Sequence, residues 1–245
     1  MVKARTDIIR KLQREILAVG GIAGHPQGAE MPAGPAFWKD HFPNGSLPLA
    51  AMHEFISHSQ EGVAASSGFI SALLSTCLSG HGAIVWLSPE PLIFPPALCS
   101  FNLLPQEIIF IHPANEKDLL WTTEEALKCP GLRAVVAETR NLPAMASRRF
   151  QLAVEKSKVT GFLVNRTKGD PVANNCVSRW RISTAPSITQ DGLPGIGQPH
   201  WNVQLLKIRN GKPGQWMMEW SGEQLAMVNT KASSTMEAKV HKLTG

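Results

Sequence analysis

The residues whose spacing comes nearest to a chemical motif run from Ser57 to Ala64, with the letters SHSQEGVA. They lie between an apolar segment and a helical pattern, the setting of a phosphate-binding loop of the form GxxxxGK(S/T). In that motif the Lys contacts the terminal phosphates and the hydroxyl binds Mg²⁺, yet Val63 and Ala64 stand there, and a later register over 66–70 fails equally. We therefore expect Ser57, Gly62, Val63 and Ala64 to form a degenerate phosphate loop. Small residues at a helix start could still bind an anion, and a plain turn with a helix cap is the other interpretation.

Two carboxylates follow predicted buried strands, at the edge where α/β sheets bind ligands. Glu90 follows GAIVWL, where an ATPase would hold a carboxylate that orients water, and Glu138 ends LRAVVAE, where a magnesium-binding Asp is missing. Without a phosphate-binding Lys, both are vestigial or are ordinary strand-end polar residues. The histidines lack companion metal ligands, and no nucleophile motif is present. We therefore expect no catalytic residue, no metal and no cofactor.

Basic residues gather in the last third of the chain and are candidates for DNA or partner binding. They are Arg166, Lys168, Arg179, Arg181, Lys207, Arg209 and Lys212. Arg179 and Arg181 alternate with apolar neighbours, which places both on one face of a strand. Such a cluster could contact phosphates without reading bases, in which case binding would fall steeply with salt. Charge that protects a strand edge is the alternative interpretation.

The elements that must position these residues alternate as in a mostly parallel α/β sheet. The expected strands cover 49–56, 82–87, 107–112, 132–137 and 161–164, and the expected helices cover 64–78, 95–104, 116–128 and 143–159. After these, 176–183, 201–209 and 215–220 alternate in hydropathy, and Asn210-Gly211 predicts a hairpin. We expect these three segments to extend the parallel sheet as antiparallel strands.

An amphipathic helix over residues 4–19 precedes this pattern, with Ile8, Leu12 and Ile16 on its apolar face. A Gly- and Pro-rich linker follows it. The helix could pack on its own core or on a partner or second subunit, so its apolar residues are candidates for self-association. The expected organisation is a helix and linker at 1–40, a core domain at 41–222 and a weakly ordered tail at 223–245.

Composition indicates a globular protein, since 43% of the 245 residues are hydrophobic and 18% are charged. The net charge of +5 divides into +2 for 1–40, −1 for 41–178, +3 for 179–220 and +1 for 221–245. The excess at the two ends suggests an acidic partner or a solubilising surface. Four scattered cysteines, no signal peptide and no membrane span predict a cytoplasmic protein.

Several segments together resemble the ImuA family of bacterial damage-inducible mutagenesis proteins. They are HFPNGSLPLAAMHEF, FPPALCSFNL, EKDLLWTTEEALKCPGLRAVVAE, ASRRFQLAVEKSKVTGFLV, SRWRI and WNVQLLKIRNGKPGQWMMEW, which lie in this order between residues 41 and 220. The resemblance as a whole covers about residues 2–222. ImuA proteins look like relatives of RecA that have lost its ATP site. LPLAAMHEFIS resembles the RecA strand before the phosphate loop, and LLKIRNGKPG its late basic hairpin strand.

The resemblance implies a RecA-like fold and an accessory role in error-prone translesion synthesis during the SOS response. The implied partners are ImuB, a Y-family polymerase relative without catalysis, and an error-prone C-family DNA polymerase. RecA and DNA are further candidates.

Two other functions remain open from the sequence. One is a cell-division inhibitor that resembles SulA and binds FtsZ, although the long basic hairpin argues against it. The other is a DNA-stimulated ATPase whose phosphate site lacks the usual motif.

Overall fold

The computed structural model describes residues 38–78, 82–90, 93–167, 169, 172–187 and 197–228. The expected N-terminal helix with Ile8, Leu12 and Ile16, the linker to residue 37 and Lys168 lie outside the described residues. So does the tail from residue 229. The expectations for these segments stay predictions.

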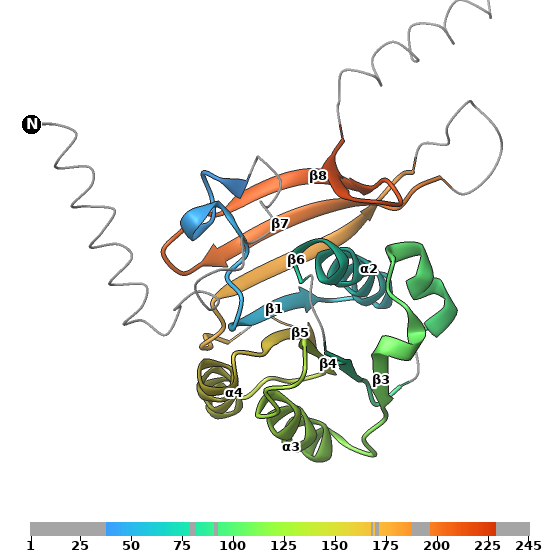
Figure 1. Cartoon of the computed structure of the whole chain (residues 1–245). Coiled ribbons are helices and arrows are strands. Elements are labelled where there is room, and N and C mark those ends of the chain that lie inside the picture. The colour runs from blue at the N-terminus through green and yellow to red at the C-terminus, as the bar shows by residue number, and fades with distance from the viewer. Residues whose placement is uncertain are drawn as a thin grey trace, which may run out of the picture.

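The described residues form one mixed sheet in the order β3-β2-β4-β5-β1-β6-β7-β8-β9 (Figure 1). The strands are β1 (Met52–Ser57), β2 (Ile84–Leu87), β3 (Ile108–Ile111), β4 (Ala134–Thr139), β5 (Thr160–Arg166), β6 (Ser178–Ala185), β7 (His200–Ile208), β8 (Gly214–Trp220) and β9 (Leu225–Met227). Every pairing from β3 through β6 is parallel, and β6 through β9 pair antiparallel. The mostly parallel sheet with an antiparallel extension is confirmed.

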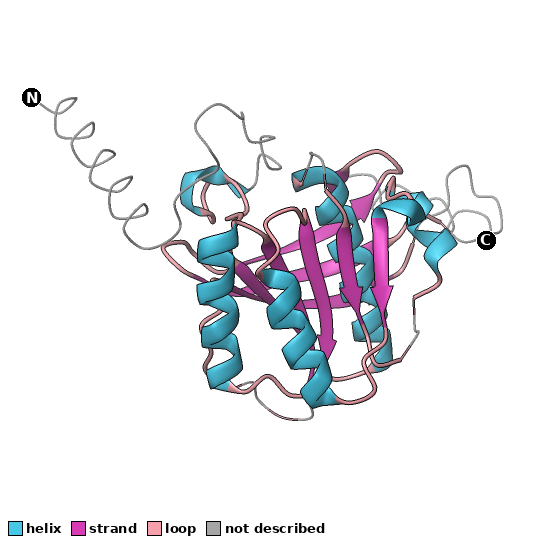
Figure 2. Ribbon diagram, turned by 60° about the horizontal axis from the view of Figure 1, so that its bottom comes forward, coloured by secondary structure: helices cyan, strands magenta, loops and turns pink. Residues whose placement is uncertain are grey.

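Helices cover the two faces of this sheet unequally (Figures 1 and 2). The α-helices are α2 (Gln60–Cys77), α3 (Glu116–Leu127) and α4 (Ala144–Ser157), and the 3₁₀ helices are η2 (Pro43–Gly45), η3 (Pro95–Phe101) and η4 (Pro105–Glu107). Helix α2 packs on one face, and α3 and α4 pack on the other against the parallel strands. The antiparallel strands reach beyond α3 and α4 (Figure 1).

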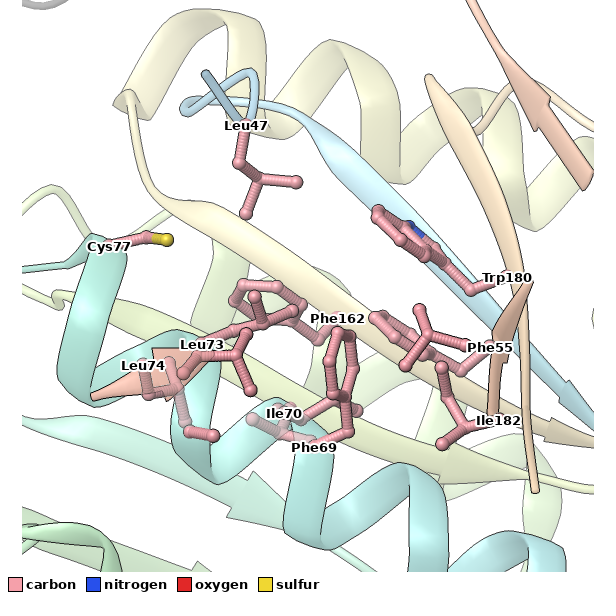
Figure 3. Close-up of a cluster of buried hydrophobic side chains, with 14 of the residues drawn as sticks. Leu47, Phe55, Phe69, Ile70, Leu73, Leu74, Cys77, Phe162, Trp180 and Ile182 are labelled. Atoms are coloured by element: carbon pink, nitrogen blue, oxygen red, sulfur yellow. The ribbon is translucent and has the colours of Figure 1, made fainter. Parts of the chain in front are cut away.

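Alternation along β1 divides the core into two layers, because successive side chains of a strand point to opposite faces. Phe55 faces α2 and stacks on Trp180, with ring centroids 5.9 Å apart and planes 4° apart. Phe69 of α2 and Phe162 of β5 complete this aromatic layer (Figure 3). Met52 faces the other way, into the layer beneath α3 and α4.

Three details differ from the sequence expectations. Strand β6 is parallel to β1 and only its other edge, toward β7, is antiparallel, because the chain crosses β1 between β5 and β6. Residues 95–101 form a 3₁₀ helix that begins with two prolines and ends at Asn102, which has the left-handed φ of 57°. The sheet continues to β9, past the boundary expected at residue 222.

Candidate functional site

The connection between β1 and α2 is a two-residue turn rather than a phosphate-binding loop. Strand β1 ends at Ser57 and α2 begins at Gln60, so only His58 and Ser59 join them. Ser59 caps the helix by accepting a hydrogen bond from the Gly62 amide at 3.1 Å. A GxxxxGK(S/T) loop has six residues before its Lys, and this two-residue turn is too short to hold them.

Gly62, Val63 and Ala64 therefore belong to the first turns of α2, not to a loop as the sequence frame suggested. The Ser57 hydroxyl, which donates to the Ser59 carbonyl at 2.9 Å, lies where a side chain at position 62 would go. A Cβ built on Gly62 would come within 2.3 Å of that oxygen. Gly62 lets α2 pack closely on the end of β1. Val63 is on the buried side of α2.

Glu138 lies buried at the end of β4, where two neutral donors hold its carboxylate. Trp86 Nε1 donates to one oxygen at 3.0 Å, and the Ser88 hydroxyl lies 3.1 Å from the other. Burial raises the pKa of Glu138 above its ordinary value, and the hydrogen bonds from Trp86 and Ser88 oppose that rise. Both oxygens are thus occupied within the protein.

Glu90, after β2, forms ion pairs with two arginines from neighbouring strand ends. It contacts Arg140 directly and lies 3.3 Å from Arg166 Nη2. Arg166 was expected beside the other basic residues, but the end of β5 carries it to this edge of the sheet. Arg140 was not among the predicted site residues. Its position two residues after Glu138, at a strand end, could have indicated that it lies in this cluster. We call Glu90, Glu138, Arg140 and Arg166 the strand-end cluster.

The space among the strand-end cluster residues is small, and a cavity of about 230 Å³, lined among the described residues by Val63, Ala64 and Glu138 but by no Lys or Arg, lies beside it. The cavity among the cluster residues, lined also by Val63, has a volume of about 10 Å³. Small-molecule sites usually enclose ~300–1,000 Å³. The two guanidiniums, the cations here that a phosphate would need, both pair with Glu90, and with Glu138 the cluster has two acidic and two basic residues. The cluster can hold the strand ends together, and it offers no ready phosphate site.

Arg179 is not a free DNA-binding residue, because it neutralises a buried carboxylate. Its Nε lies 2.6 Å from Glu54 Oε2, and the Glu54 side chain is 0% exposed. Arg179 Nη2 also donates to the Val172 carbonyl at 2.7 Å, while Asn165 donates to the second oxygen of Glu54 at 2.8 Å. A buried charge of this kind must keep its partner, so the guanidinium is committed to the fold.

Four predicted basic residues remain toward the hairpin. Arg181 of β6 lies opposite Gln204 of β7, and Lys207 is exposed on the same face. Arg209 Nη2 lies 3.5 Å from the Asn175 carbonyl, and Lys212 lies at the exposed hairpin turn.

The face that carries Arg181 and Lys207 is mostly polar, because most apolar residues of β6, β7 and β8 point toward α2. Met217 of β8, opposite Asn202 and 42% exposed, is an apolar residue on this face. Gln215 donates to Asn202 at 3.0 Å on this face. No described helix covers it beyond β6 (Figure 1). We call Arg181, Asn202, Gln204, Lys207 and Gln215 the open sheet face.

The histidines near β1 have structural contacts. Buried His53 lies 2.6 Å from the Ser178 hydroxyl and 2.8 Å from the Pro48 carbonyl, and burial lowers its pKa to about 4. His58 contacts the Thr167 carbonyl at 2.9 Å. Among the described residues, no three His, Cys, Asp or Glu side chains are grouped as metal ligands. Within the same residues, no helix has the length and apolar character that crossing a membrane requires.

The fold and this edge define an α/β protein whose mostly parallel sheet carries a self-neutralised strand-end cluster at the usual ligand position. No protein-family model matches the chain. It is 33% identical over 190 residues to Protein ImuA of Caulobacter vibrioides, in two strains, covering 73% of this chain and 78% of the relative. The chain belongs to the ImuA family.

Proposed function

We propose that this protein is a non-catalytic accessory factor of error-prone translesion DNA synthesis, acting by protein binding in the cytoplasm during the SOS response. Membership of the ImuA family supports a role in damage-inducible mutagenesis. The α/β sheet agrees with the RecA-like scaffold that this family resemblance implies.

The observation that carries the non-catalytic part is the junction of β1 with α2. Its two-residue turn has no lysine, and Val63 and Ala64 lie inside the helix. Phosphoryl transfer depends on positioned cations that stabilise charge on the transferred group. Arg140 and Arg166 are the nearest candidates, and both are engaged in ion pairs with Glu90. A scaffold that retains the fold without this chemistry is suited to docking.

The proposed partners are ImuB and an error-prone C-family DNA polymerase, with RecA as a further one. We expect the full chain to co-purify with ImuB, and its deletion to abolish damage-induced mutation while spontaneous mutation is unchanged. A deletion strain that still mutates normally after ultraviolet damage would contradict the proposal. Filamentation on overexpression without ImuB would instead support the SulA-like alternative.

DNA binding is a second candidate activity, favoured by the open sheet face. Arg181 and Lys207 lie on it without a covering helix among the described residues. Asn202, Gln204 and Gln215 lie beside them, so the face can contact phosphates through charged and polar side chains. An ATPase stimulated by DNA would additionally need a phosphate cation, which the strand-end cluster does not leave free.

A further inference from the structure

Three large apolar side chains are exposed on the outer surfaces of α3 and α4, and none of them belongs to the strand-end cluster. Trp121 is 63% exposed, Met145 78% and Leu152 48%. Apolar side chains this exposed on neighbouring elements are typical of interaction surfaces. The same face holds a groove of about 440 Å³ between the two helices. Its lining includes Leu152, Pro130, Lys128, Arg149 and Lys156. We call this the α3–α4 groove.

The two helices run side by side in the same direction, because each connects successive parallel strands. Arg149 of α4 pairs with Glu124 of α3 at 3.2 Å, which fixes their relative level. Trp121 and Met145 therefore lie about one turn earlier on their helices, and Leu152 about one turn later. Leu152 thus lines the groove, and the exposed Trp121 and Met145 lie outside its lining, toward the N-terminal ends of the helices.

The charges along α4 are spaced regularly around Leu152. Arg148 and Lys156 lie four residues before and after it, so the three share one stripe of the helix. Arg149 and Lys128 are already paired with Glu124. Arg148 and Lys156, by contrast, form no ion pair within the part of the chain that the structure describes. A carboxylate from another molecule would find both cations available.

The lining of the groove has a positive balance. Three cations, Lys128, Arg149 and Lys156, line it together with one acidic residue, Glu124, a net charge of +2. The chain's own N-terminal segment is like-charged: within 4–19 it has four Lys or Arg against two Asp or Glu, also +2. Like charges facing each other disfavour that segment, from this chain or a second copy, as the occupant.

We propose that the α3–α4 groove binds an acidic amphipathic helix of another protein. An apolar side chain of that helix packs on Leu152 and Pro130, and carboxylates one turn to either side of it contact Arg148 and Lys156. Helix-in-groove recognition uses this i, i+4 spacing of anchors. The surface goes beyond the proposed function, which assigns no docking site, and it does not involve the open sheet face.

The test uses the full chain and two fluorescein-labelled synthetic helical peptides, measured by fluorescence anisotropy. One peptide has Leu on one face and Glu on the other, and its control has Lys in place of every Glu. We expect saturable binding of the acidic peptide, weakened by salt, and none of the basic peptide. Equal binding of both peptides, or no binding of the acidic one, would overturn the proposal.

Variants locate the contact. The double substitution Leu152→Glu with Lys156→Glu should weaken binding of the acidic peptide by about tenfold or more. Lys39→Glu, an exposed charge before β1, is the matched control and should leave binding unchanged. If the double variant loses its melting transition and is therefore unfolded, the affinity of the single variant Lys156→Glu for the acidic peptide is measured instead. Unchanged affinity in the folded groove variants would refute the assignment.

Light scattering tests whether a second copy of this chain, rather than another protein, occupies the groove. If Leu152→Glu converted a dimer of the native chain into monomers, the groove would be an interface between copies, and the proposal would be wrong. An unchanged mass with weakened peptide binding supports it. Co-purification with ImuB is a separate measurement, so failure of the groove and failure of the mutagenesis role are distinguishable.

Discussion

At the scale of single residues, the protein neutralises its charges internally at the position where a nucleotide would bind. Glu90 lies between Arg140 and Arg166 and forms an ion pair with each of them. Arg179 likewise serves Glu54 rather than an outside ligand. The Glu90 pairs hold strand ends together, and the Arg179 pair joins the neighbouring strands β1 and β6. These charged residues thus have structural roles, although the sequence suggested ligand binding.

Removing Glu90 tests that interpretation directly. We expect Glu90→Gln to free the two guanidiniums, so that inorganic pyrophosphate raises the melting temperature of the variant but not of the native protein. The ion pairs are partly exposed, so the stability lost should stay within about 1 kcal/mol. Glu125→Gln, which removes an exposed partner of Lys128, is the control. A variant that pyrophosphate leaves unaffected would contradict the role given to Glu90.

His53 makes stability depend on pH. Its folded pKa is about 4 against the ordinary 6.5, because it is buried. Between these values the unfolded chain binds a proton that the folded protein does not, so stability falls as the pH drops from 6.5 to 4. The loss amounts to roughly 3 kcal/mol.

Urea unfolding at several pH values measures the His53 effect. His53→Gln should flatten the pH dependence between 6.5 and 4 relative to the native chain. His58→Gln, at an exposed histidine, should leave it unchanged. Parallel pH profiles for the native chain and His53→Gln would show that this histidine is not the cause.

At the scale of elements, the junction of β1 with α2 shows what could and could not be predicted. The apolar stripe predicted a helix from residue 64, but α2 begins at Gln60, because a Ser59 cap stabilises a polar first turn that hydropathy does not reveal. Alternation gave the correct faces of β6. It could not show Glu54 beneath Arg179, since one strand's pattern contains no information about which strand lies beside it.

The same junction gives a prediction for Gly62. Alanine in a helix is favoured over glycine by about 1 kcal/mol, but here its Cβ would force the Ser57 hydroxyl out of its hydrogen bond. We expect Gly62→Ala to destabilise the native chain by about 1 kcal/mol. In a Ser57→Ala background, which lacks this hydroxyl, Gly62→Ala should stabilise the protein by a similar amount. Thermal unfolding of the double-mutant cycle measures the difference, and an equal effect in both backgrounds would disprove the close-packing role.

The antiparallel strands give a prediction for DNA binding. Arg181→Glu with Lys207→Glu should weaken binding of single-stranded DNA and reduce its salt slope, because two phosphate contacts are lost. A gel-shift titration at several salt concentrations measures both effects. Lys39→Glu is the control, since it lies off the open sheet face. Unchanged affinity in the double variant would exclude that face as the contact.

At the scale of the whole molecule, the two sides of the sheet have different outer surfaces. One side buries the aromatic layer beneath α2 (Figure 3). The other presents the α3–α4 groove and, next to it along the sheet, the open sheet face. The mostly parallel direction was predictable from the βα rhythm, whereas the strand order was not, because the rhythm does not show that β1 lies between β5 and β6. The groove was not predictable either, because it depends on how two helices pack rather than on either sequence alone.

The measurement that tests the central claim most directly is a calorimetric titration of the full chain with ATP and Mg²⁺. Because the turn after β1 contains no Lys or Arg and the two arginines nearby are held in ion pairs with Glu90, we expect no saturable heat up to millimolar ATP. A functional P-loop ATPase titrated in the same buffer is the positive control. A one-site isotherm with micromolar affinity would contradict the account.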